Sequence, residues 1–130
     1  MINFKSFFFL AVCSLWLLSC GDDEPESTCT QEDYVGTWAG PENCTIGSGS
    51  SNLMVTIVAK GADIEINGGS FETDVVTVDE ENCSVFGTNS SFGQSFEYSG
   101  SIDGDNLFLT HKRIIAGQTV NTCTYTLERQ

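Results

Sequence analysis

The sequence predicts an all-β domain, an antiparallel up-and-down barrel of eight strands, with a two-sheet β-sandwich as the alternative. No helix-period pattern of apolar residues appears after residue 28. Instead, short runs rich in Val, Ile, Thr, Phe and Tyr alternate with clusters of Gly, Asn, Asp and Ser. Turn signals recur about every 8–14 residues, a spacing typical of antiparallel sandwiches and barrels.

Four strands are expected in the first half of the domain, at 34–44, 53–59, 63–67 and 71–78. Pro41 predicts a bend or bulge inside the first of them, because proline cannot donate a ladder hydrogen bond. Lys60-Gly61 predicts the turn between the second and third strands. Asn67-Gly68-Gly69 is a strong hairpin signal before the fourth.

Four more strands are expected at 83–88, 92–102, 107–115 and 119–128. The turns between them are 79–82, 103–106 and 116–118. Two of these turns, at 79–82 and 103–106, gather carboxylates, which raises the alternative of a weak cation site. A full calcium site needs six to eight oxygen ligands, so an ordinary solvated turn is the favoured interpretation at both places.

Alternation along the strands defines a set of side chains that point inward. These are mostly bulky, so a packed core with at most a shallow pocket at the open end is expected, because an eight-stranded barrel is just wide enough for side chains to fill it. The inward set is Trp38, Leu53, Val55, Ile57, Ile64, Ile66, Phe71, Val85, Phe96, Tyr98, Leu107, Leu109, Tyr125 and Leu127.

The N-terminus carries a separate signal. An apolar run from Phe7 to Leu18 follows Lys5, and its length fits a signal-peptide core of about 7–15 residues better than a spanning helix of about 20. Leu17-Leu18-Ser19-Cys20 resembles the bacterial lipoprotein signal. The resemblance implies that residues 1–19 are removed and that Cys20, modified with palmitate-type acyl chains, anchors the protein in a membrane.

The mature chain is expected to contain an acidic tether, residues 20–28, and a single domain, residues 29–130. The run Gly21-Asp22-Asp23-Glu24 resembles the export signal that sends lipoproteins to the outer face in one group of Gram-negative bacteria. The resemblance implies an outer membrane, cell-surface location. A solvated tether is the alternative, since like charges beside Pro and Ser stay extended.

Charge and motifs exclude several function classes. Residues 20–130 hold 18 acidic and four basic side chains, a formal charge of −14, and such a surface repels nucleic acid. No nucleophile-elbow, phosphate-loop or dinucleotide motif occurs, so neither an enzyme nor a cofactor is expected. A metal site is not expected either, because no Cys-x-x-Cys pair occurs and His111 is the single histidine.

Four cysteines remain beyond Cys20, and an even number in an oxidising compartment predicts two disulfides. Four cysteines allow three pairings. In an up-and-down barrel, Cys44 at the top of the first strand lies beside Cys123 on the last, across the closing seam. Cys29 and Cys83 then both lie at the bottom. The topology therefore favours Cys44–Cys123 with Cys29–Cys83.

The segment Tyr34-Val35-Gly36-Thr37-Trp38 resembles the first-strand Gly-x-Trp motif of lipocalins and fatty-acid-binding proteins. The resemblance implies that Trp38 plugs the closed end of a barrel and that Arg129 stacks on it. Two features depart from the fatty-acid-binding pattern. The 47–51 segment is a flexible Gly/Ser loop instead of a helical lid, and Cys123-Thr124-Tyr125 replaces the carboxylate-binding Arg-x-Tyr.

A lipocalin-like barrel implies a small hydrophobic ligand, bound by a monomer at the open end near Tyr98, His111 and the 47–51 loop. The alternative function is a surface interaction or adhesion module for a protein or glycan, without an internal ligand. That alternative depends on four apolar side chains on the opposite face from the inward set, which would form a partner surface if they gather in one patch: Met54, Phe86, Phe92 and Phe108.

Overall fold

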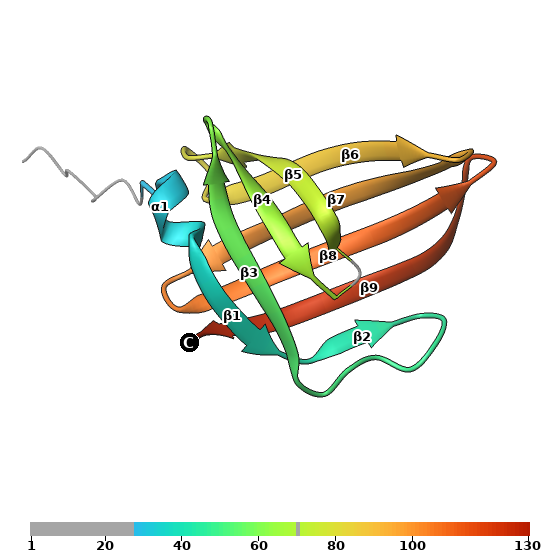
Figure 1. The fold of residues 1–130 in the computed structure, drawn as a ribbon, viewed down its shortest axis with the longest axis horizontal. Coiled ribbons are helices and arrows are strands. Elements are labelled where there is room, and N and C mark those ends of the chain that lie inside the picture. The colour runs from blue at the N-terminus through green and yellow to red at the C-terminus, as the bar shows by residue number, and fades with distance from the viewer. Residues whose placement is uncertain (1–27, 70) are drawn as a thin grey trace, which may run out of the picture.

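The computed structural model describes residues 28–69 and 71–130. The signal peptide, Cys20 and all of the tether except Thr28 lie outside these residues. Among the described residues, no helix is long and apolar enough to cross a membrane. The elements are α1 (Gln31–Tyr34), β1 (Gly36–Gly40), β2 (Glu42–Cys44), β3 (Leu53–Lys60), β4 (Asp63–Gly68), β5 (Phe71–Asp79), β6 (Ser84–Ser91), β7 (Gln94–Asp103), β8 (Asn106–Ile115) and β9 (Gln118–Arg129) (Figure 1).

These elements form a closed antiparallel barrel of eight strands with one additional short strand, as the sequence predicts. Neighbouring strands follow one another in chain order from β3 to β9, and β1 joins β3 to β9 to close the barrel. The predicted first strand bends at Pro41, which divides it into β1 and β2. Both pieces pair with β9, so the seam consists of two short ladders on one long strand.

The barrel has a closed end and an open end (Figure 1). Helix α1 lies at the closed end together with the β3–β4, β5–β6 and β7–β8 turns and the C-terminus. The β6–β7 and β8–β9 turns lie at the open end. Since residue 28 leads directly into α1, the described chain begins at the closed end.

Two local features differ from the sequence prediction. The predicted sixth strand does not begin at Phe92, because Phe92 and Gly93 both have left-handed backbone angles, φ 50° and 76°, and form the two-residue turn between β6 and β7. The one-turn helix α1 was not predicted. Its start is fixed by Asp33, whose carboxylate accepts hydrogen bonds from the backbone N–H and the hydroxyl of Thr30.

Bulky side chains fill the interior of the barrel at its closed end. Of the predicted inward side chains, twelve are buried, and Leu53 and Phe96 are half-buried against them. Four further side chains complete the core: Tyr34, Val76, Ile102 and Cys123.

Trp38 plugs the closed end through an arrangement that joins β1, β9 and α1. Its indole N–H donates to the carbonyl of Tyr34 at 2.9 Å, and the guanidinium of Arg129 lies over its ring, 4.2 Å from the centroid. Arg129 also donates to the carbonyls of Asp33 and Val35. These carbonyls end a helix and have no intrahelical partner, so Trp38 and Arg129 together stabilise α1. This is the arginine contact that the lipocalin resemblance implies.

Gly36 makes this arrangement possible. Its φ of +142° lies in the region that favours glycine, and a Cβ at this position would come within 3.2 Å of Arg129 Nη1. The Gly-x-Trp motif therefore supplies both the turn out of α1 and the ring that closes the barrel.

The two disulfides join Cys29 to Cys83 and Cys44 to Cys123, the two pairs that the topology predicts. Cys29–Cys83 fixes the chain before α1 to the β5–β6 turn. Cys44 and Cys123 are direct ladder partners of β2 and β9, so their disulfide crosses the closing seam.

Tyr34 is one of the side chains that fill the closed end. Its side chain is fully buried, and its hydroxyl has no hydrogen-bond partner among the described residues. Burial, and then the carboxylates of Asp33 and Asp79, raise the pKa of Tyr34 from 10.0 to about 12. We expect Tyr34→Phe to be neutral or to stabilise the domain by up to about 1 kcal/mol, because it removes an unsatisfied polar group.

The difference in stability between Tyr34→Phe and the wild-type protein should grow above pH 10, in favour of the variant. There the unfolded tyrosine loses its proton while the folded one keeps it, so the wild-type protein loses stability as the pH rises. Urea unfolding of both proteins at pH 7.5 and pH 10.5 measures this. A destabilised variant at pH 7.5 would show that the hydroxyl makes a bond that matters to folding.

Candidate ligand-binding site at the open end

A pocket of about 500 Å³ opens at the end of the barrel opposite α1. All of its lining residues come from β5 to β9. They are Asp74, Asn89, Ser91, Gln94, Phe96, Tyr98, His111, Arg113, Asn121 and Cys123.

Aromatic rings form the inner wall of the pocket. Tyr98 and His111 are ladder partners on β7 and β8, and their rings are nearly parallel with centroids 5.0 Å apart. Phe96 stacks on His111 at 5.4 Å. Phe71 lies behind them, 5.7 Å from Tyr98 and 4.9 Å from Tyr125. The stacking on both Phe96 and Tyr98 fixes the orientation of His111.

Two buried polar side chains lie against this wall. Asp74 on β5 is 5% exposed and accepts a hydrogen bond from Asn89 Nδ2 at 3.3 Å. The ladder between β5 and β6 covers only Thr77–Asp79, so this bond connects the two strands where they separate toward the open end. His111 is 7% exposed, and its Nε2 has no hydrogen-bond partner among the described residues. Buried polar atoms are normally bonded, so an unpartnered one beside a pocket indicates a place for a ligand atom or water.

Burial lowers the pKa of His111 below its ordinary 6.5, while the carboxylates of Asp74 and Glu42 oppose the shift. The imidazole is therefore neutral at pH 7. In the unfolded chain the same histidine takes up its proton near pH 6.5. The contribution of neutral His111 to the free energy of unfolding is therefore fully present above pH 6.5. It is lost as the pH falls from 6.5 through the pKa of His111 in the folded protein.

We expect the melting temperature of the wild-type protein to fall between pH 7.5 and pH 5, and His111→Gln to remove most of this dependence. Differential scanning calorimetry in this range measures it. The carboxyls of Glu65 and Asp79, whose pKa values are lowered by hydrogen bonds from Lys60 and Asn82, affect stability only at more acidic pH. Equal pH slopes in the two proteins would contradict the assignment to His111.

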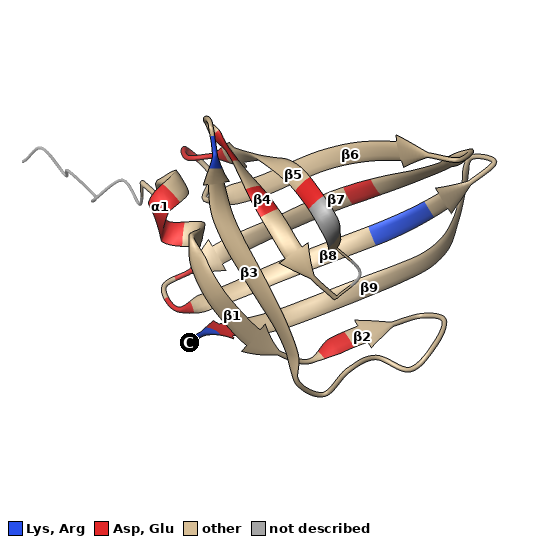
Figure 2. Ribbon diagram, in the orientation of Figure 1, with Lys and Arg blue, Asp and Glu red and all other residues tan. Residues whose placement is uncertain are grey.

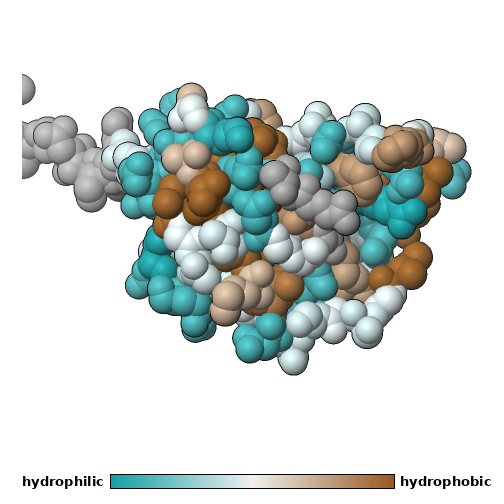
Figure 3. Space-filling view, in the orientation of Figure 1, coloured by the Kyte–Doolittle hydropathy of each residue, from teal (hydrophilic) through white to brown (hydrophobic). Residues whose placement is uncertain are grey.

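The mouth of the pocket combines charge with apolar surface. Arg113 at the mouth donates from Nε to Gln94 Oε1, and it belongs to the basic pair on β8 near the open end (Figure 2). Three apolar side chains at this end are exposed, namely Ile46, Phe92 and Ile115. Apolar surface is visible at the same end of the molecule in the space-filling view (Figure 3).

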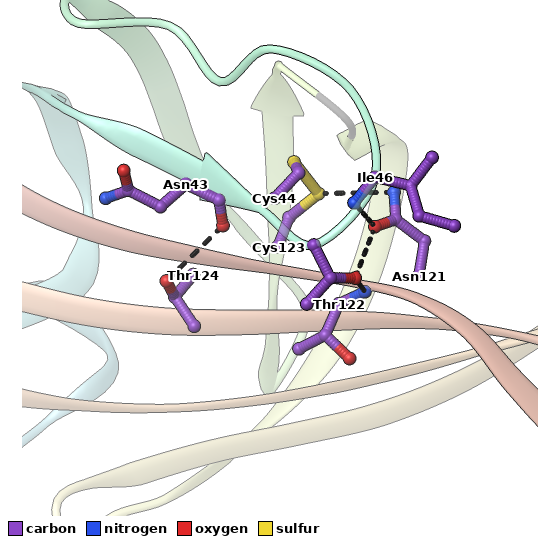
Figure 4. The surroundings of a disulfide bond; sticks show 8 residues. Asn43, Cys44, Ile46, Asn121, Thr122, Cys123 and Thr124 are labelled. Atoms are coloured by element: carbon purple, nitrogen blue, oxygen red, sulfur yellow. Dashed lines mark hydrogen bonds between the residues drawn. A yellow bond between two sulfur atoms is a disulfide. The ribbon is translucent and has the colours of Figure 1, made fainter.

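Two lining residues of the pocket, Asn121 and Cys123, belong to the closing seam, and Figure 4 shows their surroundings. Asn121 Oδ1 accepts hydrogen bonds from the backbone N–H of Ile46 and from the hydroxyl of Thr45. Asn121 Nδ2 lies 3.8 Å from the sulfur of Cys123. The disulfide and this asparagine hold the chain after β2 against β9, which fixes the position of two lining residues.

The structure places the predicted ligand residues Tyr98 and His111 together in this pocket. The 47–51 loop, predicted to lie beside them, does not line the pocket. Instead it runs along β2, where Ser50 O accepts from Glu42 N and Gly49 lies so close to the Glu42 carbonyl that a Cβ would collide. Sequence reasoning missed Asp74 and Asn89.

The four predicted outward apolar residues are exposed, but they do not form one patch. Met54 lies on β3, Phe86 on β6, Phe92 in the β6–β7 turn and Phe108 on β8. β3 is not a neighbour of β6 or β8 in the sheet. This dispersion weakens the argument for a single partner surface.

The acidic turns lie at the closed end, away from the pocket. Asp79 accepts two hydrogen bonds from Asn82, and Asp105 pairs with Arg129 at 3.3 Å. One cluster with metal-ligand atoms occurs among the described residues, formed by Glu42, Cys44 and Cys123. Both of its sulfurs are bonded in the disulfide and offer no thiolate.

Comparisons of the chain with protein-family models, with curated proteins and with solved structures find no match. The likeness to lipocalins and fatty-acid-binding proteins therefore rests on the eight-stranded barrel and on the arrangement of Gly36, Trp38 and Arg129.

Proposed function

We propose that this protein is a lipid-anchored lipoprotein of the outer membrane whose barrel binds a small ligand at its open end. The observation that carries the binding proposal is the open-end pocket, where a buried imidazole nitrogen with no partner among the described residues lies beside a wall of aromatic rings. Such a pocket, mostly preformed and with a few convergent polar groups, is typical of small-molecule sites.

The lining favours a small, partly polar ligand over a long acyl chain. Among the described residues, Trp38, Tyr34 and the isoleucines of β3 and β4 fill the closed half of the barrel, where a chain would have to lie. One copy of the protein is sufficient to form this site, because all the lining residues belong to one barrel.

The position of Thr28 supports an orientation in which the closed end of the barrel faces the membrane. Thr28 lies at the α1 end, and only seven residues, 21–27, separate it from Cys20 in the sequence. A lipid on Cys20 would hold the closed end toward the membrane and leave the pocket facing away from it. Ligand would then enter from the aqueous side.

The anchor is tested with the full chain in a bacterium that processes lipoproteins. A radioactive fatty acid should label the wild-type protein, and Cys20→Ser should abolish the label. Cys13→Ser is the matched control, because Cys13 belongs to the segment that is removed. Protease treatment of intact cells then reports surface exposure. Loss of label in both variants, or in neither, would contradict the assignment to Cys20.

Binding is tested with residues 20–130 carrying Cys20→Ser, prepared with oxidised disulfides. A panel of aromatic amines, aromatic acids, fatty acids and haem is screened by melting temperature, since a ligand that binds the native state raises it. NMR spectra should show that an active compound shifts the signals of Phe96, Tyr98 and His111. Shifts confined to outer-face residues, or no shift with any compound, would favour the interaction module.

A further inference from the structure

Asp74 is a buried carboxylate that forms no ion pair with a basic side chain of the described residues. The ion pairs found among the described residues join Lys60 to Glu65 and Arg129 to Asp105. Arg113 lines the same pocket but donates to Gln94 and forms no ion pair with Asp74. Removing a carboxylate from water is unfavourable unless a partner compensates, and here the described residues supply one neutral amide, Asn89.

We propose that the ligand of the open-end pocket is a small organic cation with a flat apolar body, and that Asp74 binds its charged nitrogen. This inference rests on the proposed function and names the ligand class for the same site.

The aromatic wall fits the other half of such a ligand. Phe96 and Tyr98 line the pocket together with Asp74 and His111, and Phe71 packs behind Tyr98. Ring faces attract cations and stack on flat apolar groups. A carboxylate beside aromatic rings is therefore suited to an ammonium or amidinium group on an aromatic body.

His111 Nε2 provides a second polar contact. The imidazole is neutral at pH 7, so Nε2 in its unprotonated form accepts a hydrogen bond from a ligand N–H. An ammonium has three N–H groups and can donate to both Asp74 and His111. A carboxylate ligand has no N–H to donate and would be repelled by Asp74.

An inorganic cation fits less well than an organic one. Among the described residues, no group of three His, Cys, Asp or Glu side chains with converging ligand atoms includes Asp74. A zinc site needs three or four such side chains with converging ligand atoms. The net charge of −14 on residues 20–130 further favours cations, because it raises their concentration near the surface.

Three probes of similar shape test the inference: benzylamine as the cation, benzyl alcohol as the neutral form and benzoate as the anion. Binding to residues 20–130 with Cys20→Ser is measured by NMR titration at pH 7 and low salt. We expect benzylamine to bind at least about tenfold more tightly than the other two, because hydrogen bonds to ionised groups are the stronger ones. Signals of His111 and Tyr98 should shift.

Asp74→Asn keeps the shape of the side chain and removes its charge. We expect it to weaken benzylamine binding at least about tenfold and to leave benzyl alcohol binding unchanged. Glu97→Gln is the matched control, because it makes the same change of charge on the exposed face of β7. Melting temperatures of both variants verify that they are folded.

The outcomes separate the two proposals. If benzyl alcohol or benzoate binds in the pocket as tightly as benzylamine, the pocket remains a ligand site and the assignment of a cation is wrong. The same conclusion follows if Asp74→Asn and Glu97→Gln weaken benzylamine equally. If none of the three probes shifts a pocket signal, both the ligand class and the site are wrong.

Discussion

Replacing both Cys44 and Cys123 by alanine is expected to lower the free energy of unfolding by about 4–5 kcal/mol in the chain-entropy model. The disulfide joins residues 79 apart in the sequence, so its loss frees a long loop in the unfolded chain. It also crosses the closing seam, where the ladders are short. β1 and β9 pair at two positions and β2 and β9 at three, whereas β8 and β9 pair at ten.

Urea unfolding under oxidising conditions measures this effect. The matched control is Cys29→Ala with Cys83→Ala, which removes a bond of 54-residue separation at the closed end. Both pairs should cost similar stability, but only the loss of Cys44–Cys123 should disturb the NMR signals of Asn121 and the other mouth residues. A loss below about 1 kcal/mol for the seam pair would mean that β2 and β9 hold together without their disulfide.

The pairing of the cysteines could be predicted because it depends on topology alone. Strand order and direction place Cys44 beside Cys123 and Cys29 near Cys83 whatever the details of the ladders. The core was predictable for a related reason. Alternation along β3 and β4 assigns Val55, Ile57 and Ile64 to one face, and one face of a closed barrel must be its interior.

Asp74 was missed because a bulge changes which residues of β5 face inward. Ile66 pairs with Asp74 but Gly68 pairs with Phe71, so the register shifts by one residue between these pairs. Phe71 and Asp74 therefore both point into the barrel, although their odd separation would place them on opposite faces of a regular strand. The bulge has no clear signal in the sequence, and it places the carboxylate in the pocket.

Helix α1 and the β6–β7 turn were missed for different reasons. Four residues are too few for a helical period, and α1 is stabilised by Trp38 and Arg129, which are distant in sequence from one another. The Thr30–Asp33 capping box was the available signal. Phe92 favours strands, yet it lies in a turn with positive φ, because Gly93 and the pairing of Ser91 with Gln94 fix the hairpin.

Trp38→Ala is expected to lower the free energy of unfolding by about 3–5 kcal/mol. The ring is fully buried at the closed end, and alanine would leave a cavity between β1 and β9. The change also removes the indole N–H that bonds to Tyr34 O and the surface on which Arg129 lies. Phe92→Ala is the control, since Phe92 is 98% exposed and its truncation should change stability by less than about 0.5 kcal/mol.

A double-mutant cycle then separates the cation–π contact from packing. Trp38→Phe keeps a ring but weakens the attraction for a guanidinium, and Arg129→Met keeps length without charge. We expect a coupling energy of about 0.5–2 kcal/mol between the two changes. Because Arg129 bonds to two carbonyls of α1 and its C-cap and Trp38 to one, hydrogen exchange at Tyr34 and Val35 should quicken more in the Arg129→Met variant than in Trp38→Phe. Additive effects would show that Arg129 acts on the helix carbonyls and that its position over Trp38 adds nothing to stability.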